Sequence, residues 1–227
     1  MVVIRQLGLF ARSLGGAMDR PRAPRIEQSH FQLRAALWGV LLIWLGYTVL
    51  YTLCPDDGPA ALLEFLPGVL AVGILFAAGF SRKDCFLRCA PLSGAGLAWL
   101  GASLLFMPLI WLTGRWTGWD SRVALIYAPA SGVSQELFFR AALLPVLLAA
   151  FKGRPLLANL THALLFALWH VPKAALTAPL GGVIGVVMVT FMCGLLWAKQ
   201  VQRDGTVLWV MWYHSLILIG NSFFTWG

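Results

Sequence analysis

Residues 134–144 read SQELFFRAALL and place two opposite charges inside an apolar run long enough to cross a bilayer. Glu136 precedes Arg140 by four residues, which is the helical spacing at which an acid and a base form an ion pair. Full charges are costly among lipid chains, so a helix that faces only lipid is a poor interpretation of this stretch. The stretch therefore predicts a membrane helix whose polar side is buried against other helices.

The composition of the whole chain agrees with this interpretation. Of the 227 residues, 59% are hydrophobic and 11% are charged, and the mean hydropathy is +0.79. A soluble domain has about 25% charged residues, so we expect an all-α polytopic integral membrane protein surrounded by the lipid bilayer. The net charge of +8 comes from basic residues scattered between apolar runs, so no nucleic-acid partner is expected.

Seven apolar segments have about the length that a transmembrane helix needs. Pro129 and Gly132 are expected to interrupt the fourth segment just before the polar stretch. If residues 123–130 form a separate half-helix, the number of membrane segments becomes eight. The predicted spans are residues 35–53, 60–80, 92–112, 123–151, 156–171, 180–198 and 206–224.

Residues at the span boundaries predict where the helices end. Pro172 is expected to end the fifth span, and residues 199–205 are expected to form a polar turn. Glu64 lies near the start of the second span. It is either a second buried acid or, as expected for a residue near a span end, a side chain that reaches the headgroup layer. Trp116 and Trp119 follow the third span and suit an interfacial belt.

The distribution of Lys and Arg predicts the orientation. With the N-terminus inside, 13 of the 17 basic residues lie on the inner side and three in outer loops, while Arg140 lies within a span. This bias makes residues 1–34 a basic cytoplasmic tail and residues 35–227 the transmembrane domain of a protein in a bacterial inner membrane. The turn at Asp56 and Asp57 holds no basic residue and would lie outside. The tail is either an amphipathic helix on the inner membrane surface or a disordered segment.

The cysteines predict packing rather than metal binding or redox work, because they lie in or beside apolar segments without a metal-ligand pattern. Two of them are four residues apart and would share one face if their segment were helical. No cofactor is expected. The cysteines are Cys54, Cys85, Cys89 and Cys193.

Polar residues in three spans are predicted to meet. In the orientation above, Glu136 lies about 20 Å along the fourth span, His170 near the outer end of the fifth, and His214 near mid-depth in the last. We therefore expect a shared polar site between the middle and the outer half of the membrane. His162 lies about 12 Å along the helix from His170, so it and Asn159 are interpreted as packing or span-end residues.

Three ordered motifs carry a resemblance to a known family. QELFFR at residues 135–140 is followed by FALWH at residues 166–170, and His214 lies in the last span. This pattern resembles the CPBP family of intramembrane proteases, the type II CAAX prenyl endopeptidase or Abi group. That family has E-E-x-x-x-R, F-x-x-x-H and H-x-x-x-N on successive buried helices. The resemblance covers residues 123–221.

The resemblance implies metal-independent hydrolysis of a peptide bond. A glutamate and a histidine would hold and activate water, while the last histidine and an asparagine would stabilise the oxyanion. This chemistry needs a base and hydrogen-bond donors in a dry site, which suits the residue types present. The resemblance assigns site roles to Glu136, His170, His214, Arg140 and Gln135, with Asn221 and Phe166 as weaker candidates.

The sequence departs from the family pattern at two positions. Gln135 replaces the first glutamate, and an amide cannot act as a general base, so Glu136 is the carboxylate left in the motif. Leu218 replaces the asparagine. Asn221 lies about 10 Å beyond His214 on a straight helix, so it needs a local bend to serve, and Ser215 is another nearby polar group.

Three hypotheses of function remain open. The first is an endopeptidase that cuts a membrane-associated protein near its C-terminal end, with C-terminal sorting signals as one substrate class. The second is a non-catalytic immunity or scaffold protein that keeps the fold, or a Glu-to-Gln variant at Gln135 that traps substrate. The third is a metal-dependent membrane hydrolase or ion carrier with Glu136, His170 and His214 as ligands, although no H-E-x-x-H spacing is present. The oligomeric state is not predicted.

Overall fold

The structure is a computed structural model that describes residues 29–54, 62–106, 112, 115–118 and 120–225. Three expectations lie outside these residues: those for the tail up to residue 28, for the acidic turn at Asp56 and Asp57, and for Trp119. The described part of the chain is helical apart from turns and two short strands, so the all-α fold class is confirmed.

The elements follow one another in a simple order. The π-helical turn η3 joins α7 to α8, and a second π-helical turn, η2, leads into α7, so that these elements form one continuous helix. The strands β1 and β2 pair antiparallel. The elements are α2 (His30–Leu53), α4 (Phe65–Ala77), α5 (Gly94–Ser103), η1 (Leu104–Phe106), β1 (Arg115–Trp116), η2 (Val123–Tyr127), α7 (Ala128–Phe138), η3 (Phe139–Leu143), α8 (Leu144–Ala150), α9 (Pro155–Thr177), α10 (Leu180–Asp204), α11 (Leu208–Asn221) and β2 (Phe224–Thr225).

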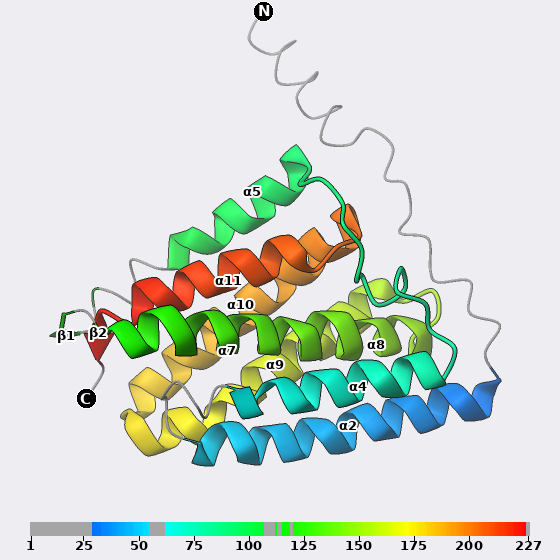
Figure 1. The fold of residues 1–227 in the computed structure, drawn as a ribbon, viewed down its shortest axis with the longest axis horizontal. Coiled ribbons are helices and arrows are strands. Elements are labelled where there is room, and N and C mark those ends of the chain that lie inside the picture. Colours follow the sequence, from blue (N-terminus) through cyan, green and yellow to red (C-terminus); the bar gives the residue numbers. More distant parts are fainter. Residues whose placement is uncertain (1–28, 55–61, 107–111, 113–114, 119, 226–227) are drawn as a thin grey trace, which may run out of the picture.

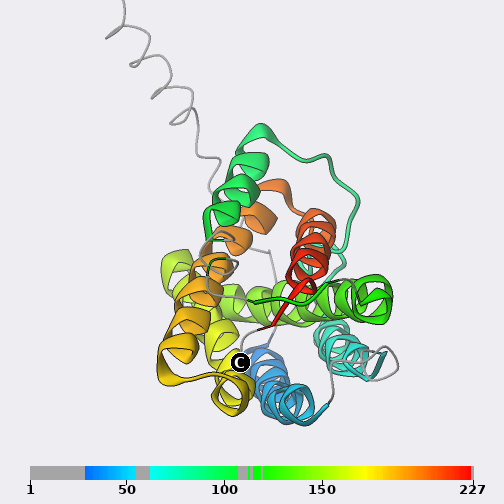
Figure 2. The same ribbon diagram turned by 90° about the vertical axis from the view of Figure 1, so that its left-hand side faces the viewer.

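Successive helices run in alternating directions along the long axis of the molecule (Figure 1). The helix formed by α7 and α8 occupies the middle, where α4 and α11 both pack against α7 and where α2 and α9 pack against α8. α10 packs on α9 and α5. Figure 2 shows the α7–α8 helix passing between α2 and α4 on one side and α10 and α11 on the other.

The central helix is far more buried than its neighbours. In the most apolar window of Val123–Ala150, 78% of the residues are buried, against 17% in the corresponding windows of α2 and α10. The outer helices therefore expose apolar side chains, as expected for surfaces that meet lipid. The helix that carries the polar stretch is enclosed by protein, which is what its charges require.

Among the described residues, three helices are long and apolar enough to cross a membrane: His30–Leu53, Val123–Ala150 and Leu180–Asp204. α4 is apolar but shorter. These helices support an integral membrane protein, whereas the number of seven spans stays a prediction.

The predicted break in the fourth span is wrong, because the helix runs without interruption from Val123 to Ala150. The π-turn η2 directly precedes Pro129, and the Ala128 N–H bonds to the carbonyl of Val123 instead of that of Ala124. This shift in hydrogen-bond pattern accommodates the proline within the helix. The separate half-helix that would have made an eighth segment is therefore not present.

Gly132 serves close packing rather than a break. A Cβ atom at Gly132 would lie 2.8 Å from the backbone nitrogen of Ser215 in α11. Only a residue without a side chain allows the two helices to approach so closely.

Two other boundaries also differ from prediction. α9 continues through Pro172 to Thr177, with the loss of one backbone hydrogen bond instead of the end of the helix. Residues 199–204 belong to α10 rather than to a turn. Side chains in this segment bond within the helix and to α9: Gln200 donates to Asp204 at 3.0 Å and Gln202 donates to Asn159 at 2.7 Å. Gly205, with φ of +68°, then ends the helix.

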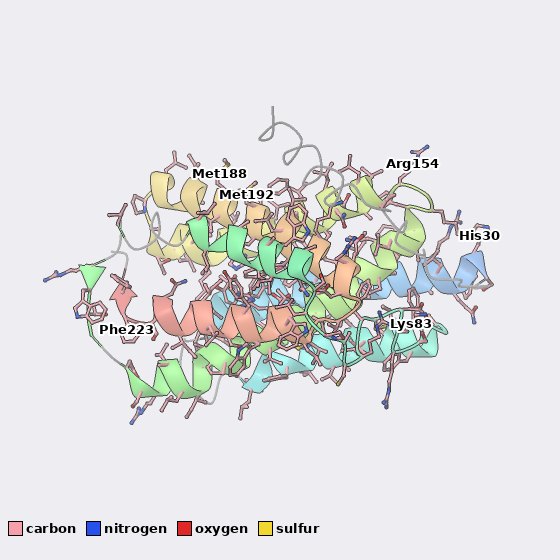
Figure 3. The ribbon with its side chains drawn as sticks, turned by 90° about the horizontal axis from the view of Figure 1, so that it is seen from above. His30, Lys83, Arg154, Met188, Met192 and Phe223 are labelled. Carbon is pink, nitrogen blue, oxygen red and sulfur yellow. The ribbon has the colours of Figure 1, made fainter. Side chains whose placement is uncertain are left out.

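The loops that are predicted to lie on the inner side of the membrane gather at one end of the molecule. Figure 3 shows His30, Lys83 and Arg154 at one end of the molecule and Phe223 at the other. At the first end, Arg88 donates to the carbonyl of Gly205 at 2.8 Å, which ties the loop after α4 to the turn between α10 and α11.

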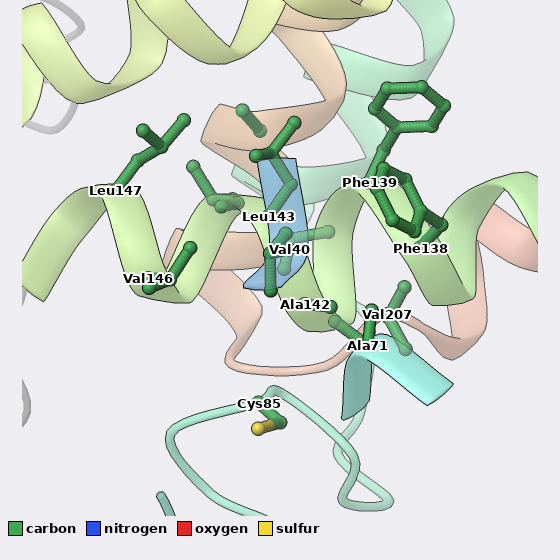
Figure 4. Packing of buried hydrophobic residues seen from close by; sticks show 14 of the residues in the cluster. Val40, Ala71, Cys85, Phe138, Phe139, Ala142, Leu143, Val146, Leu147 and Val207 are labelled. Carbon is green, nitrogen blue, oxygen red and sulfur yellow. The ribbon is translucent and has the colours of Figure 1, made fainter. Parts of the chain in front are cut away.

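The cysteine segment in this loop is not helical, so Cys85 and Cys89 do not share a helix face as the spacing predicted. Cys85 is buried against the apolar core, together with side chains from α2, α4 and the central helix (Figure 4). Burial, followed by the charge of Asp84, raises the pKa of the Cys85 thiol to about 12. Cys89 is exposed, and all four cysteines are free. Cys85 therefore acts as a packing residue.

At the opposite end the two short strands join the loop before the central helix to the C-terminal residues. Trp116 stacks on Phe223 with ring centroids 5.2 Å apart and an interplanar angle of 2°. The Trp116 side chain remains exposed, which agrees with the interfacial position expected for it.

Candidate functional site

Glu136 lies at the centre of a buried charged cluster, which we call the Glu136 cluster: Glu136, Arg140 and His214. One carboxylate oxygen, Oε1, is 3.0 Å from Nη1 of Arg140 and 2.8 Å from Nδ1 of His214. Glu136 and Arg140 are 0% exposed and His214 is 5% exposed. The structure thus brings together the two motifs that lie 78 residues apart in the chain.

The packing of α7 on α11 sets this geometry. Gly132 lies one turn before Glu136 and contacts Ser215, the neighbour of His214. The close approach at Gly132 therefore fixes which residue of α11 faces Glu136. Arg140 lies in the π-turn η3, which begins directly after α7.

Phe166 of α9 lies against several of the polar groups. The guanidinium carbon of Arg140 is 4.1 Å from the centre of the Phe166 ring, a cation–π distance. The rings of His170 and His214 lie 4.8 Å and 6.4 Å from it. Phe166, a weak candidate from the sequence, is thus an apolar side chain that lies against Arg140, His170 and His214.

His170 is oriented by its own helix. Its Nδ1 lies 2.8 Å from the carbonyl oxygen of Phe166. A carbonyl accepts and cannot donate, so Nδ1 carries the proton, and Nε2 of the neutral ring keeps a lone pair that can accept a hydrogen bond. The ring also lies edge-on to Tyr51 and Trp169.

Gln135 belongs to a different set of contacts. Its Nε2 donates to Ser131 Oγ at 2.9 Å, and Ser131 in turn donates to Glu64 Oε2 of α4, also at 2.9 Å. Ser134 donates to Ser131 O at 3.0 Å, lies 3.4 Å from Glu64 Oε2, and lies 3.3 Å from the hydroxyl of Tyr47. We call these five residues the Glu64 cluster.

The expectation that Glu64 reaches the headgroup layer is wrong, because its side chain is 1% exposed. The carboxylate turns toward the two serines of α7 and not toward the end of the helix. One signal in the sequence points to it: Ser131, Ser134 and Gln135 form a polar face on an apolar helix, and such a face needs a partner.

Two buried acceptors near the site have no hydrogen-bond partner among the described residues. They are Oε1 of Gln135 and Oε2 of Glu136. Buried polar atoms are nearly always paired, so both are available to a donor such as water or a peptide N–H.

Other candidates lie away from the Glu136 cluster or are already engaged. Asn221 is the last residue of α11, which runs as a regular helix from His214, so the two lie about 10 Å apart along its axis. Ser215 donates to the carbonyl of Met211 at 2.8 Å. His162 is buried beside Phe139 and serves packing, as predicted.

No group of three His, Cys, Asp or Glu side chains placed to hold a metal ion is found in the described part of the chain. Glu136 and His214 contact one another, while Nδ1 of His170 bonds to its own helix backbone.

The comparisons with known proteins bear on the segment that forms this site. The search of curated proteins found no match. The matching family is described as type II CAAX prenyl endopeptidase Rce1-like, and its model covers the central helix, α9, α10 and most of α11. Residues 117–219 of this chain thus match an endopeptidase family, which confirms the resemblance to the type II CAAX prenyl endopeptidases that the three motifs predicted.

Proposed function

We propose that the protein is an intramembrane endopeptidase of the glutamic type, with Glu136 as the general base. The observation that carries this proposal is the state of the Glu136 carboxylate. Its Oε1 is held by Arg140 and His214, while its Oε2 has no partner among the described residues. A fixed carboxylate with one oxygen available is suited to take a proton from water.

The proposed reaction is hydrolysis of one peptide bond. Oε2 of Glu136 takes a proton from a water molecule whose other hydrogen bonds to Nε2 of His170. The water oxygen attacks the carbonyl carbon. In this proposal His214 carries a proton on both ring nitrogens, so that Nδ1 donates to Glu136 while Nε2 donates to the oxyanion. The proton on Glu136 passes to the leaving nitrogen, the C–N bond breaks, and a carboxylic acid and an amine are formed. Arg140, stacked on Phe166, keeps Glu136 in place.

The proposed substrate is a membrane-associated protein that is cut near its C-terminal end, with C-terminal sorting signals as one class. The proposed orientation places the N-terminus in the cytoplasm. The gathering of His30, Lys83 and Arg154 at one end supports it (Figure 3).

The activity is tested with the purified full chain in proteoliposomes. The probes are an internally quenched peptide with a farnesylated C-a-a-X end, the same peptide without the lipid, and a single-span reporter with a fluorescent C-terminal tail. Glu136→Gln should lower kcat by about 10²- to 10⁴-fold, since it removes the base. Hydrolysis that survives both Glu136→Gln and His170→Ala would refute the mechanism.

Gln135→Glu decides between the endopeptidase and the non-catalytic alternative. If the chain as given cleaves a probe, Gln135 is compatible with catalysis. Activity found only in Gln135→Glu would show that the chain as given is an inactive or substrate-trapping form. No activity in either would support an immunity or scaffold role.

The orientation is tested with single-cysteine variants and a maleimide that cannot cross the membrane. Cys89 is exposed at the proposed inner end, and Cys54 follows α2 at the opposite end. Labelling of the two from opposite sides, with Cys54 reached from outside, is expected. Labelling of both from the same side would refute the topology.

A further inference from the structure

The Glu64 cluster contains a second buried carboxylate that the proposed mechanism does not use. Glu64 lies on the helical turn that leads into α4, yet its contacts are with residues of α7 directly before Glu136. A charged group is costly in this environment, so its retention beside the catalytic helix calls for a physical reason.

The direction of the hydrogen bonds in this cluster is fixed. Ser131 has one hydroxyl proton and donates it to Glu64 Oε2, so its oxygen can only accept from Gln135. Gln135 must therefore turn its NH₂ group toward Ser131 and its carbonyl oxygen away. That oxygen is the buried acceptor without a partner among the described residues.

A second chain of hydrogen bonds holds Glu64 from α2. Ser134 uses its proton on the carbonyl of Ser131, with Glu64 Oε2 at 3.4 Å as the other acceptor in reach. Tyr47 must then donate to Ser134 across 3.3 Å. Both chains thus meet at Ser131, whose carbonyl accepts from Ser134 and whose hydroxyl donates to Glu64. By accepting that proton, Glu64 sets the direction of the hydrogen bond between Gln135 and Ser131.

From this geometry we infer that Glu64 is a positioning residue for the peptidase site. Through Ser131 it holds Gln135 so that the amide oxygen accepts a hydrogen bond from water or from the peptide N–H of the substrate. Without Glu64, the Ser131 hydroxyl is free to donate to Gln135 instead, and the amide turns over. This inference rests on the proposed function.

The same geometry explains why an amide stands at position 135. A glutamate there would place two carboxylates around one hydroxyl, which can donate to only one of them. Gln135 and Glu64 are therefore a matched pair, in which α4 supplies the acid that the motif on α7 lacks. The double variant that exchanges the amide of Gln135 and the carboxylate of Glu64 should therefore keep more activity than either single variant.

The test measures kcat, KM and thermal unfolding in detergent for single and double variants with the proteoliposome probes above. Glu64→Leu and Ser131→Ala should lower kcat by about 10²-fold through misplacement of the amide. Glu64→Gln keeps an acceptor for Ser131 and should recover most of that loss. Ser134→Ala is the matched control, because it removes an equally buried hydroxyl that does not contact Gln135.

The double variant in which Gln135 and Glu64 are exchanged gives the most decisive measurement of kcat. Gln135→Glu alone should lower kcat, and Gln135→Glu combined with Glu64→Gln should restore it. The inference is overturned if Ser131→Ala and Ser134→Ala have equal kcat, or if Glu64→Leu changes only the unfolding temperature. If the parent chain cleaves none of the probes, both the proposed function and the role of Glu64 are refuted. If the parent chain is active and the Glu64 variants have the same kcat, only the role of Glu64 is refuted.

Discussion

The two buried carboxylates beside α7 are stabilised in different ways. Glu136 is compensated by full or potential positive charge, from Arg140 and His214. At Glu64, Oε2 accepts from hydroxyl groups, with Ser131 and Ser134 within 3.4 Å. An ion pair fixes the position of a carboxylate, whereas a hydroxyl network also fixes the direction in which neighbouring groups donate. The first arrangement suits a reacting group and the second suits its support.

The Glu136 cluster and the Glu64 cluster should differ most in the stability that is lost when a hydrogen-bond donor to the carboxylate is removed. Arg140→Leu leaves Glu136 buried with only His214, and breaking one side of a buried pair destabilises by about 3–5 kcal/mol. Ser131→Ala removes a neutral donor, for which about 1–3 kcal/mol is expected. Denaturant unfolding in detergent measures both. Equal effects would show that Glu136 does not depend on its charged partner.

A change at the helix contacts should separate the clusters geometrically. Gly132→Ala forces a Cβ against the backbone of Ser215, so α11 must move and His214 with it. A loss of about 1–3 kcal/mol is expected. In the matched variant Gly68→Ala, the three atoms nearest the new Cβ belong to the Leu137 side chain and lie 3.2 Å away, so a smaller shift is needed than at Gly132, where the nearest atoms lie 2.7–2.9 Å away. Unfolding temperatures that fall equally in both variants would contradict the role of Gly132.

The smallest effect is expected at Tyr47, the first donor in the chain of hydrogen bonds that leads through Ser134. Tyr47→Phe removes the donor to Ser134 but leaves Ser131 and Gln135 bonded as before. About 0.5–1.5 kcal/mol of stability should be lost, since one neutral hydrogen bond is removed. The kcat of this variant should stay near that of the parent chain. A large loss of kcat would mean that the two chains of hydrogen bonds do not act separately.

The sequence predicts the fold class and the pairing of Glu136 with Arg140 because both follow from local rules. Apolar segments of sufficient length predict membrane helices, and a spacing of four residues predicts the ion pair. The match of residues 117–219 confirms the resemblance that the motifs indicated. His214 was expected to converge with Glu136 from its depth alone, and the structure brings the two into contact.

Other features depend on contacts between helices and could not be predicted in this way. The buried position of Glu64 depends on how α4 rotates toward α7, which its place near a helix end does not reveal. Pro172 and Pro129 were expected to end or break helices, but α9 continues through Pro172, and the π-turn η2 leads into the helical turn that contains Pro129. Asn221 was expected to need a bend to reach the site, and α11 is regular up to that residue.

The π-turns on either side of α7 change which face of the helix each segment presents to its neighbours. Each π-turn contains about one residue more than an α-helical turn, which rotates everything beyond it by about 100°. The side of α7 that faces its neighbours is therefore independent of the side that α8 presents, although both belong to one helix. Deleting one residue from Val123–Tyr127 would turn the start of the helix and leave the motif in place. Deleting one of the last three residues of η3, 141–143, would keep Arg140 four residues after Glu136 and would turn α8 relative to α7.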